Sequence, residues 1–173
     1  MINDRHVHPG IRAFVRATEH FTIDRYSPKG GFGQLYFGHR NTIKDRVALK
    51  FYEISASNNP HEEAQILSNI THKNILEIFD AKVVDNDFAY FVTPEISGGD
   101  LQNYADRNII DLDTAIFIIN GVLEGLSELH KTPNNLVHRD LKPQNILIDK
   151  ATKVPFISDF GSVKKLPDGV DNV

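Results

Sequence analysis

The chain has 173 residues, which is enough for one domain, or for one domain and a fragment, with a sizeable buried core. Its 19 basic and 23 acidic side chains leave a net charge of −4, which argues against a nucleic-acid-binding protein with a basic face. The sequence contains no cysteine, which excludes disulfides and thiolate metal sites and suits a reducing compartment, so we expect a cytoplasmic protein.

The N-terminal residues 1–20 carry mixed charge and little periodicity, and we interpret them as a leader. They contain no apolar stretch typical of a secretory signal. No run of about 18 apolar residues occurs elsewhere in the sequence, so we predict no membrane span.

From residue 21 to residue 51, apolar positions partly alternate around a cluster of glycines. This pattern predicts a hairpin followed by a third strand over residues 46–51. Pro60 suits the first turn of a helix, and the apolar spacing that follows predicts a helix over residues 61–70. Two further strands are predicted over residues 75–84 and 88–93. The glycine pair at 98–99 then interrupts the pattern, and we place the boundary between two lobes there.

The C-terminal half is typical of helices, with a short one predicted over residues 101–107 and a long one over 112–131. In the long helix, one predicted apolar stripe is formed by Ile116, Ile119, Val122, Leu123, Leu126 and Leu129. Phe117 and Ile118 widen this stripe beyond one face, so we expect the helix to be buried on several sides. Two short strands are predicted over residues 145–148 and 155–158.

The most informative stretch is His-Arg-Asp-Leu-Lys-Pro-Gln-Asn at 138–145, followed by Asp-Phe-Gly at 159–161. It supplies three oxygen-bearing side chains, those of Asp140, Asn145 and Asp159. Phosphoryl transfer requires such groups, because one residue must orient the attacking hydroxyl and others must ligate the metal that neutralises the phosphates. The two segments resemble the catalytic loop and the metal-binding loop of the eukaryotic-type protein kinases. Lys142 makes the resemblance closer to serine/threonine kinases than to tyrosine kinases.

The resemblance covers roughly residues 21–165 and implies an α+β, protein-kinase-like two-lobe fold. A small β-rich lobe would span residues 21–97, and an incomplete helical lobe would span residues 98–173. The family's activation segment runs on to an Ala-Pro-Glu motif that this sequence lacks, so we expect the N-terminal part of a catalytic domain that ends within that segment. A partner or a missing chain segment would then cover the apolar surface of the 112–131 helix.

For the catalytic loop, the resemblance implies that Asp140 is the catalytic base, or the group that orients the substrate hydroxyl. Lys142 would neutralise charge on the γ-phosphate, and Asn145 and Asp159 would ligate Mg²⁺. We expect His138 to be structural. Arg139 resembles the arginine on which a phosphorylated activation segment docks in part of the family.

A glycine-rich run lies between two strand-like segments and consists of Gly30, Gly31, Phe32 and Gly33. Glycines allow backbone amides to approach phosphate oxygens closely, although a plain hairpin turn is the alternative. The family pattern G-x-G-x-x-G-x-V fits the second and third glycines. Pro28 stands in place of the first, where it removes an amide donor, and Leu35 stands in place of valine.

Lys50 ends a Val-Ala-Leu-Lys strand that resembles the family's nucleotide-binding strand, and we count Ala48 with the nucleotide-binding residues. The lysine needs an acidic partner. Glu63 is preferred over its neighbour Glu62, because Glu63 shares a helix face with Leu67. The Lys50–Glu63 pair would hold the ammonium group against the α- and β-phosphates of ATP.

The segment around residues 91–100 resembles the kinase hinge, with Thr93 as the gatekeeper beside the adenine pocket. Backbone groups between Pro94 and Ile96 would bond the adenine edge, and Asp100 would contact the ribose or cap the next helix. In this segment, the expected nucleotide-binding residues are Thr93, Pro94, Glu95, Ile96 and Asp100. Leu147, which follows the catalytic loop, is expected to contact the nucleotide as well.

The sequence therefore predicts ATP- and magnesium-dependent phosphoryl transfer to serine or threonine hydroxyls of protein substrates. The alternative is a nucleotide-binding scaffold or regulatory module without turnover, because the helical lobe is incomplete. A small-molecule kinase of the aminoglycoside type is disfavoured. The catalytic loop of such enzymes carries His-Gly-Asp, with glycine at the position of Arg139.

Overall fold

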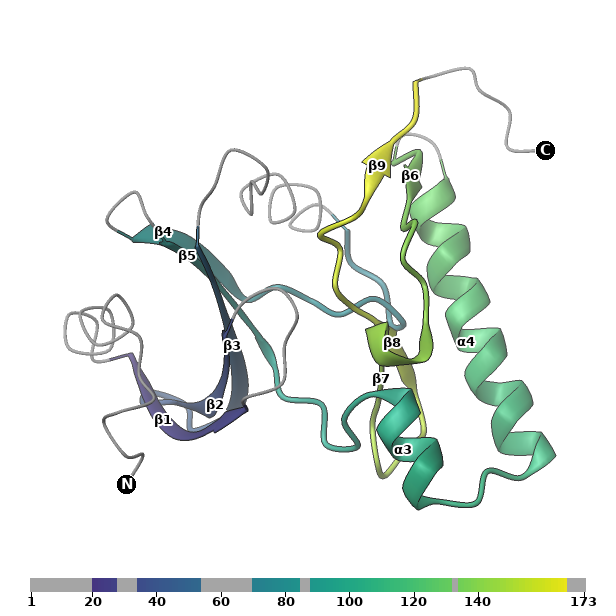
Figure 1. The fold of residues 1–173 in the computed structure, drawn as a ribbon, viewed down its shortest axis with the longest axis horizontal. Coiled ribbons are helices and arrows are strands. Elements are labelled where there is room, and N and C mark those ends of the chain that lie inside the picture. Colours follow the sequence, from purple (N-terminus) through teal and green to yellow (C-terminus); the bar gives the residue numbers. More distant parts are fainter. Residues whose placement is uncertain (1–19, 28–33, 54–69, 85–87, 132–133, 168–173) are drawn as a thin grey trace. The chain divides into compact units, whose positions relative to one another are not determined.

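The computed structural model describes residues 20–27, 34–53, 70–84, 88–131 and 134–167. The chain forms two compact units. The first contains residues 1–68 and 77–95, and the second contains residues 69–76 and 96–173. The first unit contains a five-stranded sheet and the second contains two two-stranded sheets and the described helices (Figure 1). Each unit has its own buried side chains. The glycine-rich run, Glu63 and all of the predicted 61–70 helix except Ile70 lie outside the described residues, and Ile70 itself is not helical.

The first unit is built on a five-stranded antiparallel sheet with the strand order β1-β2-β3-β5-β4. Its strands are β1 (Phe21–Ser27), β2 (Gln34–Arg40), β3 (Arg46–Glu53), β4 (Asp80–Val84) and β5 (Phe88–Pro94). The predicted strand over 75–84 is wrong for residues 75–79. Leu76 N donates instead to Ile157 O at 2.9 Å within the second unit, and Phe79 N donates to Val92 O of β5 at 2.7 Å, which leads the chain into β4.

One face of the sheet carries the core of the first unit. The side chains of Tyr36, Val47, Leu49, Phe51, Tyr90 and Val92 are all buried on this face. The Tyr36 and Phe51 rings meet edge to face at 5.7 Å, and the Phe51 and Tyr90 rings lie 5.6 Å apart. Successive residues of a strand point to opposite faces, so their neighbours in sequence lie on the other side of the sheet. This alternation places the candidate nucleotide-binding side chains of β2, β3 and β5 on the face opposite the core.

In the second unit, the helices are α3 (Leu101–Arg107) and α4 (Leu112–His130). Both begin after an aspartate that accepts a hydrogen bond from a backbone amide of the first turn, Asp100 for α3 and Asp111 for α4. The predicted bounds of both helices are confirmed to within one residue. Among the described residues, no helix is both long enough and apolar enough to cross a membrane.

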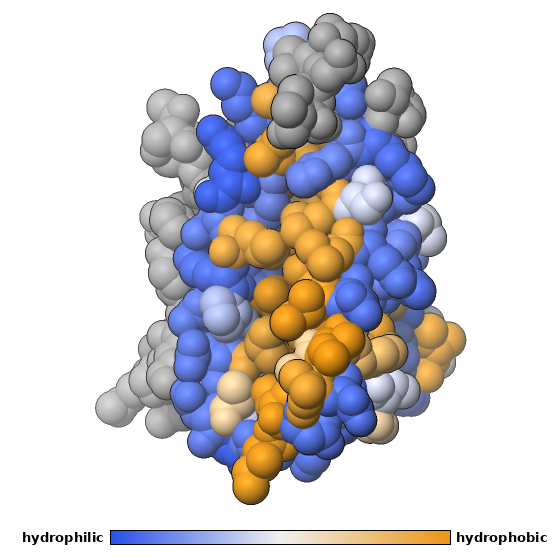
Figure 2. All heavy atoms as spheres, turned by 90° about the vertical axis from the view of Figure 1, so that its right-hand side faces the viewer, coloured by the Kyte–Doolittle hydropathy of each residue, from blue (hydrophilic) through white to orange (hydrophobic). Residues whose placement is uncertain are grey.

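The α4 helix buries one face, which carries Ile118, Val122, Gly125 and Leu129. Gly125 permits close packing, because a Cβ at this position would lie 2.9 Å from Ile157 Cδ1 and 3.0 Å from the Asn74 carbonyl oxygen. The apolar stripe predicted for this helix was partly wrong, since Val122 and Leu129 are buried but three other members are not. Its members Ile116, Ile119 and Leu123 are exposed together with Leu112 and Phe117, each at 48–74%. These five residues form an exposed apolar face of α4, which lies within the orange band of Figure 2.

Short elements complete the second unit. The strand β6 (Leu136–Val137) pairs with β9 (Lys164–Lys165), and β7 (Ile146–Ile148) pairs with β8 (Pro155–Ile157). A 3-10 turn over Pro143–Asn145 leads directly into β7. The predicted strands at 145–148 and 155–158 are confirmed to within one residue, and the β6–β9 pair was not predicted. The segment between β6 and β7 contains the candidate catalytic residues.

Candidate active site

The loop between β6 and β7 brings three of the predicted site residues into direct contact. Lys142 Nζ donates to Asp140 Oδ2 at 2.7 Å, and Asn145 Nδ2 donates to the same oxygen at 3.0 Å. The amide of Asn145 also donates to the Asp140 backbone carbonyl oxygen at 2.8 Å. The carboxylate of Asp140 is thus held from two sides through a single oxygen.

These contacts determine the charge of Asp140. The hydrogen bond from Lys142 has the largest effect and lowers the pKa of its carboxyl group below the ordinary value; desolvation opposes it, and the bond from Asn145 adds a smaller lowering of the pKa. Asp140 and Lys142 are 41% and 46% exposed, so solvent screens the ion pair and its contribution to folding is small. The contacts therefore keep Asp140 ionised and oriented.

Asn145 lies at the centre of this loop and is only 5% exposed. Its backbone carbonyl accepts hydrogen bonds from Ser158 N at 2.9 Å and from Ser158 Oγ at 3.0 Å. These bonds bring the residue that precedes Asp159 next to Asn145, and Asp159 itself has a positive φ of 61°. The sequence separates Asn145 and Asp159, but the β7–β8 hairpin brings their segments together.

This donor set fits Mg²⁺. The Asn145 amide donates both of its bonds from Nδ2 to Asp140, which turns its oxygen, Oδ1, away from that residue. Within the described ranges, no group of three or more His, Asp or Glu side chains gathers around a common point. Mg²⁺ does not need one, since it is commonly held by one or two protein oxygen ligands together with phosphate oxygens and water. Asn145 and Asp159 can supply those ligands.

His138 has a structural role, as predicted. It is 2% exposed, and its ring lies 5.2 Å from that of Phe160. Its Nε2 lies 3.0 Å from the Ser158 carbonyl oxygen, and its Nδ1 accepts from the Asp140 backbone amide at 3.4 Å. A carbonyl can only accept and an amide can only donate, so Nε2 carries the single proton of a neutral ring. Burial lowers the pKa of His138, which favours this neutral form.

Arg139 connects the catalytic loop to the segment after Asp159. Its Nε donates to the Ser162 backbone carbonyl oxygen at 2.6 Å, and its φ is 62°. The predicted docking of a phosphorylated segment on Arg139 stays a prediction.

In the first unit, the pairing of β2, β3 and β5 gathers four predicted nucleotide-binding residues on one face. Leu35 is paired with Lys50 across β2 and β3, and Ala48 is paired with Thr93 across β3 and β5. Directly paired residues of antiparallel strands point to the same side, and so do residues two apart along a strand. All four therefore lie on the face opposite the core, and all four are half-buried.

The segment that follows β5 shows how its backbone groups are used. Glu95 N donates to the Arg46 carbonyl oxygen at 3.2 Å, so this amide is already bonded within the first unit. Asp100 Oδ1 accepts from Asn103 N at 2.8 Å, which makes Asp100 the N-cap of α3. Its contact with ribose stays a prediction. Leu147 forms a backbone bridge with Asp100 and is half-buried.

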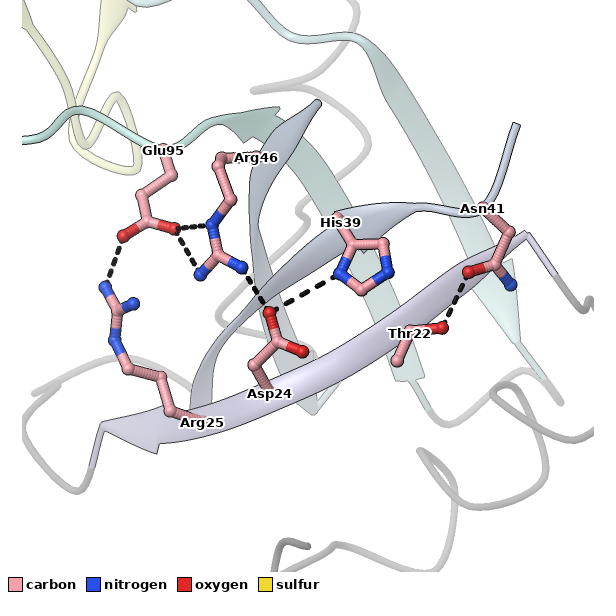
Figure 3. Close-up of polar contacts among 7 residues, drawn as sticks. All are labelled: Thr22, Asp24, Arg25, His39, Asn41, Arg46 and Glu95. Atoms are coloured by element: carbon pink, nitrogen blue, oxygen red, sulfur yellow. Dashed lines mark hydrogen bonds and ion pairs between the residues drawn. The ribbon is translucent and has the colours of Figure 1, made fainter. Parts of the chain in front are cut away.

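Sequence reasoning missed four residues of the polar cluster that includes Glu95, of which the two arginines bond the Glu95 side chain directly (Figure 3). They are Asp24, Arg25, His39 and Arg46. Their sequence signal was only a set of charged positions on otherwise alternating strands, which is typical of any solvated sheet face.

Comparisons with known proteins agree with this geometry. A family model described as the protein kinase domain matches residues 27–172. The chain is 30% identical over 169 residues to the probable serine/threonine-protein kinase PBL23 of Arabidopsis thaliana, a match covering 92% of the chain and 43% of that protein. It is 32% identical over 172 residues to receptor-like kinase LIP2 of the same plant, covering 94% and 30%. It is 30% identical over 175 residues to calcium-dependent protein kinase 4 of Plasmodium berghei, covering 92% and 32%. The chain thus spans less than half the length of these relatives.

Proposed function

Because the chain belongs to the protein kinase family, whose domain matches residues 27–172, we propose that it transfers the γ-phosphoryl group of ATP to serine or threonine hydroxyls of protein substrates. The observation that carries this proposal is the bonding of the Asp140 carboxylate by Lys142 and Asn145. Such an oriented, ionised carboxylate is what the attacking hydroxyl of phosphoryl transfer requires.

Asp140 orients the hydroxyl and accepts its proton. Both contacts to its carboxylate use Oδ2, so Oδ1 is the oxygen that would accept the substrate's hydrogen bond. Lys142 lies within bonding distance of the same carboxylate and places a positive charge where the transferred phosphoryl group develops negative charge. Lys142 and Asp140 together supply the proton acceptor and the compensating cation.

Asn145 and Asp159 would hold Mg²⁺, which neutralises charge on the ATP phosphates when it is bound. The contribution of the chain itself is orientation. The two bonds from Asn145 Nδ2 fix the amide plane, and the buried bonds from Ser158 fix the backbone that carries it. A ligand oxygen positioned in this way loses little freedom when the metal binds.

The proposal assigns the adenine and phosphate contacts to the first unit. Leu35, Ala48 and Thr93 would line the adenine pocket, and Lys50 would bind the α- and β-phosphates. The adenine edge would bond the Pro94 carbonyl and the Ile96 amide, because the Glu95 amide between them is already bonded to Arg46.

The roles of four further groups of residues rest on the family resemblance alone. The glycine-rich run at 30–33 would cover the phosphates, and Glu63 would pair with Lys50. Asp100 would contact the ribose, and Leu147 would contact the nucleotide.

The exposed apolar face of α4 favours a second candidate function, that of a nucleotide-binding scaffold or regulatory module without turnover. Exposed apolar surface on a helix of this length suits contact with a partner protein or a further segment of the protein. In that case the chain would bind ATP and Mg²⁺ but would depend on the covering partner for transfer.

Two measurements on the same chain separate the candidates. Saturating ATP with Mg²⁺ should raise the melting temperature, since ligand at about 100 times its Kd stabilises a protein by about 2.7 kcal/mol. Radiolabel from ATP should then appear on dephosphorylated casein as phosphoserine or phosphothreonine. Stabilisation without any label supports the binding module, and the absence of both effects overturns the proposed function.

A further inference from the structure

The Glu95 side chain is held by two arginines from different strands of the first unit (Figure 3). Its Oε2 accepts from Arg46 Nε at 3.0 Å and lies 2.9 Å from Arg46 Nη2, and its Oε1 accepts from Arg25 Nη2. Both carboxylate oxygens are therefore used, and the side chain is only 13% exposed. Isolated surface ion pairs usually contribute little, whereas this carboxylate is largely buried and bonded on both sides.

Each arginine is itself held by further contacts. Arg46 Nη1 donates to Asp24 Oδ2, an oxygen that also lies 3.5 Å from His39 Nδ1. The hydrogen bond from Arg46 lowers the pKa of Asp24, which keeps this carboxylate ionised. The Arg25 guanidinium group stacks on the Phe37 ring, 4.0 Å from its centre. The orientation of Glu95 is thus defined by a chain of contacts across β1, β2 and β3.

A bulge in β1 makes this arrangement possible. Neighbouring residues of a regular strand point to opposite faces, so Asp24 and Arg25 would not both reach the same cluster. The pairing of β1 with β2 shifts register between Ile23 and Arg25, and a bulge of this kind redirects side chains. Gly38 stands opposite the shift, where a Cβ would lie 2.1 Å from the Thr22 carbonyl oxygen. The local sequence thus accommodates the bulge with the one residue that fits.

The position of Glu95 gives the cluster its significance. Glu95 is the last residue of the first unit, at the point where the chain passes to the second. Both its backbone amide and its side chain are bonded to Arg46 on β3. The peptide groups on either side of it carry the Pro94 carbonyl and the Ile96 amide. The side-chain bonds restrain the Glu95 Cα, from which both of the peptide groups that would meet adenine extend.

We propose that Arg25 and Arg46 act through Glu95 as positioning residues for adenine recognition, by fixing the directions of the Pro94 carbonyl and the Ile96 amide. This inference rests on the proposed function, since it requires that the chain binds ATP. It adds a specific role for two arginines to which the proposed function assigns no contact with nucleotide or substrate.

The test is a cycle that combines one protein change with one ligand change. The dissociation constants of ATP and of purine riboside triphosphate are measured by calorimetry with Mg²⁺. The second nucleotide lacks the N6 amino group that would donate to the Pro94 carbonyl. The proteins are the wild type, Glu95→Gln, Arg46→Met and Arg46→Lys. The matched control is Asp45→Asn, which breaks the Arg40–Asp45 pair of the same sheet.

In the wild type, loss of the amino group should weaken binding about five- to tenfold, the usual value of one hydrogen bond. In Glu95→Gln and Arg46→Met the same loss should cost less than about twofold, because the carbonyl is no longer held in place. Arg46→Lys should fall between these values, and Asp45→Asn should behave as the wild type.

An amino-group penalty that is the same in Glu95→Gln as in the wild type would overturn the inference and leave the proposed function intact. A wild type that binds both nucleotides equally would also overturn it. A wild type that binds neither would contradict the proposed function itself. Unfolding of each variant without nucleotide is followed in parallel, so that loss of folding is not mistaken for loss of discrimination.

Discussion

Replacement of Asn145 by alanine tests the catalytic loop first through its effect on unfolding, a measurement that needs neither metal nor nucleotide. The change removes two hydrogen bonds, from Nδ2 to the Asp140 carbonyl oxygen at 2.8 Å and to Asp140 Oδ2 at 3.0 Å. The backbone bonds from Ser158 to residue 145 do not depend on the side chain. In the absence of metal, the side-chain bonds that the substitution removes are thus the ones that orient Asp140.

The magnitude follows from the two lost bonds. A neutral hydrogen bond contributes about 1 kcal/mol, and one to a charged group contributes about 1.5–3 kcal/mol. Because the Asp140 side chain is 41% exposed, water replaces part of the second bond, which brings it towards the lower end of that range. We expect Asn145→Ala to lower the free energy of unfolding by about 2.5 kcal/mol, or the melting temperature by about 5–10 °C for a chain of this size.

The assay is thermal unfolding in EDTA, followed by transfer of label from ATP to casein in Mg²⁺. Asn108→Ala is the matched control, since it removes one amide bond, from Nδ2 to the Tyr104 carbonyl oxygen at 2.7 Å, away from the catalytic loop. It should cost about 1 kcal/mol and leave transfer unchanged. If Asn145→Ala unfolds in EDTA as the wild type does, its contacts with Asp140 do not hold the loop and the reasoning is refuted.

Three further predictions concern other parts of the protein. His138 binds fewer protons when folded than when unfolded, so its contribution to stability is present above about pH 6.5 and is lost as the pH falls through that value. Unfolding free energies of the wild type and His138→Gln should therefore converge between about pH 7.5 and pH 5, and a constant difference would contradict the neutral ring. Gly125→Val should cost about 1–3 kcal/mol by crowding Asn74 and Ile157, as measured by urea unfolding, and an unchanged midpoint would show that α4 does not pack there. Lys50→Met should reduce turnover strongly and ATP affinity only modestly, because positioning of the phosphates is lost; a loss of affinity at an unchanged rate would argue against that role.

Much of the fold could be predicted because its signals are local. The bounds of α3 and α4 follow from their capping aspartates, Asp100 and Asp111, which stand directly before the helices. The β2 and β3 strands follow from alternating apolar residues around the glycine cluster. By contrast, β6 and β9 have two residues each, and only their mutual pairing makes them strands.

The buried face of α4 was predicted only in part, for an identifiable reason. Apolar residues surround most of this helix, so hydrophobic periodicity does not select one face. Gly125 does select it, because the backbone can approach Asn74 and Ile157 most closely where a side chain is missing. The predicted stripe left this glycine out and therefore included Ile116 and Leu123, which are exposed.

The candidate site shows the same distinction between local and long-range information. Asp140, Lys142 and Asn145 are close in sequence, and their motif alone identified all three as candidate site residues. The bonds of Glu95 to Arg25 and Arg46 join residues 70 and 49 positions apart. They depend on strand order and on a bulge, neither of which the charge pattern reveals.

The single-turnover rate of phosphate transfer from saturating ATP and Mg²⁺ to casein, compared between the wild type and Asp140→Asn, tests the central claim most directly. The side-chain size is preserved and only the proton-accepting carboxylate is removed. We expect the rate to fall by about 10²–10⁴-fold while the dissociation constant of ATP stays within about threefold of the wild-type value. Equal rates in the two proteins would contradict the assignment of Asp140 as the group that activates the hydroxyl.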